Sequence, residues 1–127
     1  MTVLLDTHAL LWFQAGDRRL SRGARLAMEA DEAALVVSAA SVWEMAIKAS
    51  LGRLRLPGTV DAYLAEKVGE GYRVLSVSGA HAARVETLPW HHRDPFDRLL
   101  AAQALEEGWP LITRDRVFRK YGVQTIW

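Results

Sequence analysis

A chain of 127 residues has the length of one ordinary domain, and with half of its residues hydrophobic it can bury a core. The formal net charge is only +1, so a nucleic-acid partner would have to be held by locally placed basic groups. The absence of cysteine excludes disulfide frameworks, zinc sites built on thiolates and cysteine hydrolases, and it fits a protein of the reducing cytoplasm.

The first half of the chain predicts two strands and three helices. Thr2 to Leu5 is a short apolar run that ends at an acid, which is typical of a strand buried on both faces. Asp6 and His8 interrupt the apolar stretch and no basic leader precedes it, so it is neither a signal peptide nor a membrane span, and we expect a soluble intracellular protein. Apolar spacing, cap residues and glycine stops predict helices over residues 8–15, 21–30 and 42–48 and a strand over residues 35–37.

The second half continues the alternation of helices and strands. Its longest helix has the clearest start, because Asp94 stands at the N-cap position and Pro95 takes the first helical position that proline favours. We expect helices over residues 60–68, 78–85, 95–107 and 116–121, strands over residues 72–77, 111–113 and 123–127, and a loop over residues 88–93. This alternation predicts one α/β domain over residues 1–127, a three-layer α/β/α architecture with a mainly parallel central sheet of four to five strands.

Four carboxylates stand near strand ends. Asp6 closes the first strand, Glu44 lies in the first turns after the second, and Asp115 follows the fourth. In an open parallel sheet, ligands bind outside the carboxyl ends of the strands, so polar residues at this rim are functional candidates. Asp97 is the exception, because it precedes its strand and must be brought to the rim by its helix.

Each of these acids also has a purely structural explanation. Asp6 and Asp115 can cap the helices that follow them, where a negative charge is mildly favourable. Glu44 stands four residues before Lys48, which is the favourable orientation for a helical ion pair. Asp97 occupies the position of the acid in a capping box, although glutamate reaches back better than aspartate.

Taken together, the four acids favour a divalent cation. Carboxylates gathered at one rim repel one another, which raises some of their pKa values and destabilises the fold unless a cation neutralises them. Oxygen ligands without a thiolate suit Mg²⁺ or Mn²⁺. Such an ion can activate a bound water for attack on a phosphodiester and offset charge on the leaving oxygen, so no covalent nucleophile of the protein is needed.

Four stretches match, in order, the motifs of a known family: LLDTHALLW, SAASVWEMAIKASLGRL, LPWHHRDPFDRLLAAQAL and LITRDRVFRKYGV. With them the chain resembles the PIN-domain ribonucleases, and within these the toxins of VapBC-type toxin–antitoxin pairs. The resemblance implies that Asp6, Glu44 and Asp97 form an acidic metal site for Mg²⁺ or Mn²⁺, with Asp115 as the fourth acid and Asp6 and Asp97 as the first ligands. It also implies a first strand placed between the second and the fourth, metal-dependent cleavage of RNA, inhibition by an antitoxin protein in the active-site groove, and a homodimer.

Several other polar and aromatic residues near the acids have a structural or a functional interpretation. Asp94 is assigned to capping, with metal ligation as the less favoured alternative, and the hydroxyls of Thr7, Ser38 and Thr113 stand where they could hold water or an acid by hydrogen bonds. The loop histidines are interpreted as neutral side chains and not as metal ligands, because they lack the spacing of a helical metal motif; they are His8, His91 and His92. The arginines near the acids either bind RNA phosphates or antitoxin carboxylates or are solvated; they are Arg93, Arg98, Arg114 and Arg116. The five tryptophans are expected mainly in the core or at an interface, with base stacking as the alternative.

Two other functions remain open at this stage. The chain is alternatively a non-catalytic PIN-like module that binds RNA or a protein. A phosphotransfer enzyme with Asp6 as covalent nucleophile is the less favoured alternative, because enzymes of that kind typically carry a second aspartate two residues later, where this chain has His8.

Overall fold

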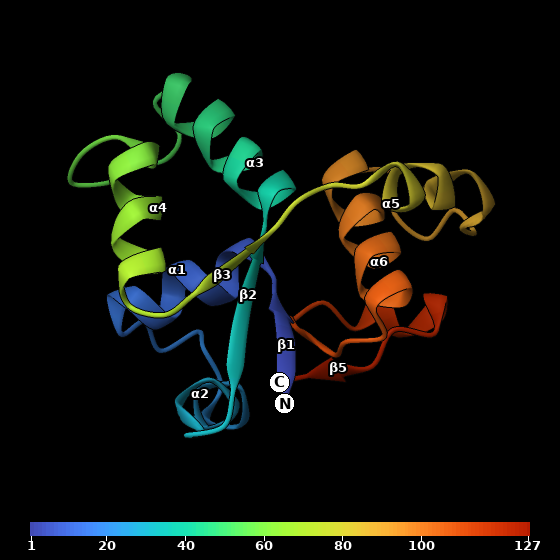
Figure 1. Cartoon of the computed structure of the whole chain (residues 1–127), viewed down its shortest axis with the longest axis horizontal. Coiled ribbons are helices and arrows are strands. Elements are labelled where there is room, and N and C mark those ends of the chain that lie inside the picture. Colours follow the sequence, from blue (N-terminus) through green and yellow to red (C-terminus); the bar gives the residue numbers. More distant parts are fainter.

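The computed structural model describes residues 1–127 and places a single five-stranded sheet between two layers of helices (Figure 1). The strands are β1 (Thr2–Leu5), β2 (Ala34–Ser38), β3 (Arg73–Leu75), β4 (Leu111–Ile112) and β5 (Thr125–Ile126). Their order is β3-β2-β1-β4-β5, and every neighbouring pair is parallel. The first strand therefore lies between the second and the fourth, as the family resemblance implies, and the predicted α/β class is confirmed.

The helices agree closely with the predicted segments. They are α1 (Thr7–Ala15), α2 (Arg22–Glu29), α3 (Ala39–Ser50), α4 (Val60–Gly69), α5 (Gly79–Arg84) and α6 (Pro95–Glu107), with 3₁₀ turns η1 (Val85–Thr87) and η2 (Arg116–Tyr121). The predicted caps are present, since Ser21, Ser78 and Asp94 each accept a backbone hydrogen bond in the first turn of their helix. Helix α3 begins earlier than predicted, because Ser38 is both the last residue of β2 and the N-cap of α3.

The strands at the two edges of the sheet are shorter than predicted. β3 keeps three residues of the expected 72–77, which pair with Val36 to Ser38, and β5 keeps two of the expected 123–127, which pair with Leu111 and Ile112. Both strands have a hydrogen-bonded neighbour on one side only, so pairing ends where β2 and β4 end. The apolar pattern of a strand alone does not predict where pairing ends, because the end of pairing is set by the length of the neighbouring strand.

The core lies on both faces of the sheet and divides along the central strand. Val3 and Leu5 of β1 pack into one cluster with residues of α1 and α2, whereas Leu4 points to the other side and joins a cluster dominated by α6. Successive side chains of a strand alternate between faces, which explains the division. All three of these residues are buried, so β1 is covered on both faces as predicted, and the layers are α/β/α.

The connections at the carboxyl ends of β1 and β2 are unusually short. Asp6 alone separates β1 from α1, and α3 follows β2 directly. The N-termini of these helices therefore stand at the carboxyl rim of the sheet, and α6, which packs against α3, starts with the Asp94–Pro95 pair in the same region (Figure 1).

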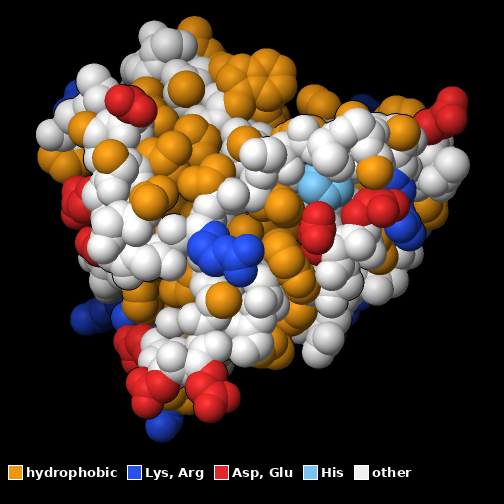
Figure 2. Space-filling view, viewed as in Figure 1, with side chains coloured by type: hydrophobic (Ala, Val, Ile, Leu, Met, Phe, Trp, Pro, Cys, Tyr) orange, Lys and Arg blue, Asp and Glu red, His pale blue; other side chains and the backbone are white.

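Apolar side chains are exposed on the surface around α3, α4 and β3. Exposed apolar side chains include Trp43 of α3, Leu51 directly after α3, Val68 of α4 and Val74 of β3. Figure 2 shows hydrophobic atoms gathered over this part of the molecule. None of the helices has the length and apolar character that a membrane span requires.

Candidate acidic site at the carboxyl rim

The carboxylate of Asp6 caps α1 and also contacts the end of β4 at the rim of the sheet. One carboxylate oxygen accepts the backbone N–H of His8 at 3.2 Å and caps α1. The other accepts the hydroxyl of Thr113 at 2.8 Å, which crosses from the end of β4. The capping explanation and the rim explanation are therefore both correct for this residue, and its carboxylate orientation is fixed from two sides.

Asp115 is held in a similar way. Its Oδ1 accepts the backbone N–H of Val117 at 2.9 Å and caps η2. Its Oδ2 lies 2.7 Å from Nε2 of His92, and its backbone N–H donates to the Thr113 hydroxyl oxygen at 3.1 Å. Thr113 thus links Asp6 and Asp115 through one buried hydroxyl, which confirms that this threonine holds an acid.

Glu44 is tied to the same rim through α1. Its Oε1 accepts the hydroxyl of Thr7 at 2.8 Å, and its Oε2 lies 3.2 Å from the ammonium of Lys48. The predicted i, i+4 pair is present, and so is the predicted threonine contact. Because Thr7 follows Asp6 directly, the hydrogen bond brings the Glu44 carboxylate next to the start of α1.

Asp97 is the acid with the most perturbed ionisation. Burial raises the pKa of its carboxyl from 3.8 to about 6, and the negative charges of Asp94, Asp6 and Asp115 add to the effect, while His92 opposes it. No protein hydrogen bond stabilises the ionised form of this carboxyl. The first turn of α6 therefore brings Asp97 within electrostatic reach of two rim acids, as the sequence predicts.

Asp94 is confirmed as the cap, since it accepts the backbone N–H of Phe96 at 2.8 Å.

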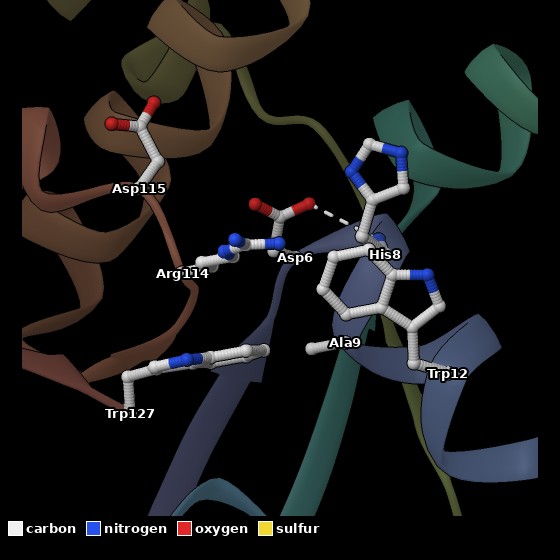
Figure 3. Close-up of a pocket in the computed structure, with 7 residues that line it drawn as sticks. All are labelled: Asp6, His8, Ala9, Trp12, Arg114, Asp115 and Trp127. Atoms are coloured by element: carbon white, nitrogen blue, oxygen red, sulfur yellow. Dashed lines mark hydrogen bonds between the residues drawn. The ribbon is translucent and has the colours of Figure 1, made fainter. Parts of the chain in front are cut away.

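The acids are neighbours without forming a closed cage. No group of three or more acidic or histidine side chains is arranged tightly enough to hold a metal ion, and Glu44 is not among the charges that act on Asp97. Asp6 and Asp115 line one cavity together with Arg114, and Figure 3 shows the Asp115 carboxyl turned away from that of Asp6. The rim is thus an open acidic surface held by side-chain hydrogen bonds.

Sequence reasoning missed the role of His92. Its ring is almost buried, stacks on Tyr121, and bridges the Tyr121 hydroxyl at 2.8 Å on Nδ1 and Asp115 on Nε2. With hydrogen on Nε2 the ring donates to the Asp115 carboxylate, and the Tyr121 hydroxyl completes the contact at Nδ1. The partners lie 29 and 23 residues away, so no local pattern signals them.

Two residues near the rim have partners other than the predicted acid or phosphate. Ser38 holds no acid, because its hydroxyl caps α3 and donates to the buried Gln103. Arg98 is neither solvated nor free for phosphate, since it is 3% exposed and donates to the backbone carbonyls of Val85, Leu88 and Pro89. Because Arg98 lies in the first turns of α6, its guanidinium reaches back under the loop that precedes the helix and donates to the carbonyls there.

The fold and the rim define a class of protein, a parallel α/β domain with carboxylates gathered where the central strands end. The PIN domain model matches residues 3–124, so the chain belongs to the PIN domain family. It is 40% identical over 122 residues to Ribonuclease VapC22 of Mycobacterium tuberculosis, covering 94% of this chain and 92% of that protein. The resemblance drawn from the four motifs is therefore confirmed at the level of the family.

Solved structures share the fold at lower sequence identity. The VapBC2 structure from Rickettsia felis, bound to a DNA fragment from its promoter, gives a TM-score of 0.71 at 13% identity and covers 98% of this chain and 97% of that one. VapC20 of Mycobacterium tuberculosis, described as a sarcin-ricin loop cleaving toxin, gives 0.66 at 19% identity, with 95% of each chain covered.

Proposed function

We propose that this protein is a divalent-metal-dependent endoribonuclease and the toxin of a toxin–antitoxin pair. The observation that carries the proposal is Asp97, a half-buried carboxyl with a pKa of about 6 that faces further acids without a hydrogen-bond donor. A carboxyl placed in this way lowers the stability of the fold, and strongly perturbed ionisable groups of this kind cluster at functional sites. The relative named a ribonuclease supports the choice of reaction.

The donor set fits a hard cation. Asp6, Asp97, Asp115 and Glu44 present carboxylate oxygens only, and the site contains no thiolate. The four carboxylates form no ready-made cage, but Mg²⁺ and Mn²⁺ keep much of their water and bind through a few carboxylates, so this open set would suffice to hold one of these ions. When bound, such an ion polarises a phosphodiester oxygen and activates water for hydrolysis.

The chain's own residues prepare the rim for this task. Thr113 and the N-terminus of α1 fix both oxygens of Asp6, and Thr7 and Lys48 fix those of Glu44. Because the pKa of Asp97 is about 6, its carboxyl is mostly ionised at neutral pH and mostly protonated below about pH 6, so cation binding at the lower pH is coupled to release of its proton.

The proposed partners are RNA as substrate and an antitoxin protein as inhibitor, in the cytoplasm. The solved VapBC2 structure of similar fold, a complex on DNA, supports a protein partner for chains of this fold. The exposed apolar side chains of α3, α4 and β3 offer a surface for such contacts, since extended apolar patches mark interaction sites. The homodimer and the single-domain extent over residues 1–127 stay predictions.

The direct test of the activity is cleavage of a structured RNA by the purified protein. We expect cleavage with Mg²⁺ or Mn²⁺, none with EDTA, and a loss of about 100-fold or more in Asp6→Asn, as for other charge-stabilising groups of active sites. Asp31→Asn is the matched control, because Asp31 is exposed in the turn before β2, and it is expected to cleave at the unchanged rate. Equal cleavage by the Asp6→Asn protein would show that the chain is a non-catalytic module contaminated by another nuclease.

A second expectation concerns His92. Replacing it with phenylalanine keeps the aromatic packing and removes the hydrogen bonds to Asp115 and Tyr121. We expect Mn²⁺ affinity to fall about tenfold, which is the usual effect of losing a group that orients a metal ligand. Titration calorimetry with Mn²⁺ measures the effect, and His91→Phe, at an exposed residue without an acidic partner, is the control. An unchanged affinity in His92→Phe would contradict the orienting role.

A further inference from the structure

A small cavity lined partly by aromatic residues opens at the edge of the acidic rim. It has a volume of about 260 Å³ and is lined by Asp6 between β1 and α1, by residues of α1, and by residues of the segments after β4 and β5 (Figure 3). Pockets for drug-sized ligands are larger, about 300–1,000 Å³. The cavity therefore suits a single planar ring system. Because Asp6 is one of its lining residues, anything bound here touches the acidic rim.

Two tryptophans form a corner of this cavity. The ring of Trp127 meets that of Trp12 edge to face, at 6.0 Å between centroids and 64° between planes. Trp12 is held in place by His8, stacked at 5.3 Å, and by the guanidinium of Arg19 at 4.8 Å from its ring. Trp127 is partly buried against the core but also lines the cavity, and because Trp12 is covered by its partners, Trp127 is the ring that offers a face to a ligand there. Figure 3 shows it lying along the lower side of the cavity.

A free cation completes the cavity. Arg114 is exposed, and none of the ion pairs of the protein includes it, although Asp6 and Asp115 line the same space. Figure 3 shows its side chain running above Trp127 toward Asp6. An unpaired guanidinium binds phosphate oxygens well and repels a basic side chain of a protein partner. The chemistry thus favours a ligand that joins a planar ring to a phosphate.

We propose that the cavity binds one nucleobase of single-stranded RNA, stacked on Trp127, while Arg114 contacts the adjoining phosphate beside the acidic rim. This inference rests on the proposed ribonuclease function and adds the subsite that positions the substrate. Every base has an aromatic face, so stacking of this kind tolerates different bases, and an arginine plane above an aromatic ring suits an unpaired base. The site would therefore require an unstacked nucleotide at one position next to the cleaved bond.

Binding is tested without any chemistry by NMR of the tryptophan indole N–H groups, assigned with single Trp→Phe variants. Adenosine and uridine 5′-monophosphate are titrated in the presence of Mg²⁺, and ribose 5-phosphate serves as the probe without a base. We expect saturable shifts of Trp12 and Trp127 with both nucleotides and none with ribose 5-phosphate, while the exposed Trp43 and Trp90 stay unchanged. No shift, or equal shifts with ribose 5-phosphate, would overturn the proposal.

Kinetics give the second readout. Trp127→Leu keeps an apolar side chain and removes stacking, so we expect KM for a short RNA to rise about tenfold, or about 1.4 kcal/mol, with kcat within about twofold. Trp127→Phe is expected to retain most of the affinity. Trp90→Leu, at an exposed tryptophan outside the cavity, is the matched control and should leave KM unchanged. A merely structural role of Trp127 would lower the melting temperature and kcat and leave KM in place.

The two proposals fail in different ways. A wild-type protein that cleaves no RNA contradicts the proposed function, and the indole titration still reports on the cavity. A wild-type protein that cleaves RNA, with Trp127→Leu at the original KM and no indole shift, overturns the base subsite alone.

Discussion

Replacing Asp97 with asparagine is expected to abolish RNA cleavage and to stabilise the metal-free fold at neutral pH. The activity falls about 100-fold or more, because a cation ligand at the rim is lost. The stability rises because the folded protein holds this carboxyl at a pKa of about 6, above its value of 3.8 as a free side chain. From the two pKa values the gain has an upper bound of about 3 kcal/mol, which solvent screening reduces to about 1–2 kcal/mol.

The pH dependence of this gain follows from proton binding. Between about pH 4 and pH 6 the folded state binds more protons at Asp97 than the unfolded state, so raising the pH across this window lowers the stability of the wild type. The variant lacks this loss. The stability difference between the two should therefore be absent near pH 4, grow up to about pH 6 and stay constant above it. Urea unfolding in EDTA measures it, and a pH-independent difference would contradict the burial of this charge.

Replacing Arg98 with alanine is expected to lower the free energy of unfolding by about 3 kcal/mol or more, without any direct effect on the acids. The guanidinium is buried, donates to the carbonyls of Val85, Leu88 and Pro89, and lies 3.8 Å from the ring centre of Trp90. The alanine variant removes the donor from three carbonyls and leaves a cavity where the guanidinium was.

The expected loss of unfolding free energy is large because hydrogen bonds that involve a charged group contribute more to stability than neutral ones. Arg116→Ala is the control, because Arg116 is exposed and surface substitutions usually change stability by about 0.5 kcal/mol or less. Thermal unfolding followed by circular dichroism compares the two. A melting temperature of Arg98→Ala equal to that of Arg116→Ala would contradict the structural role of the buried guanidinium.

Local signals were sufficient for most of the fold. The Asp94–Pro95 start of α6, the serine caps of α2 and α5 and the acid after β1 are all short-range patterns, and each is present in the structure. The strand order is not a local property. It came from the resemblance to the family and not from apolar periodicity.

The candidate site shows where sequence reasoning stops. The acids were predictable because each stands beside a strand end or in a first helical turn. The contacts that orient them join residues far apart, such as Thr113 with Asp6 at a separation of 107 residues and Thr7 with Glu44 at 37. Arg98 was misassigned for the same reason, since the carbonyls that bind it belong to a loop whose path only the folded chain defines.

Mn²⁺ binding is the most direct test that the rim acids act together as one cation site. Free Mn²⁺ is measured by electron paramagnetic resonance in titrations of the wild type, Asp6→Asn, Asp97→Asn and the control Asp31→Asn. The wild type and the control are predicted to bind Mn²⁺ saturably and alike, and the two rim variants to bind it at least about tenfold more weakly. Equal binding by all four proteins would contradict the account.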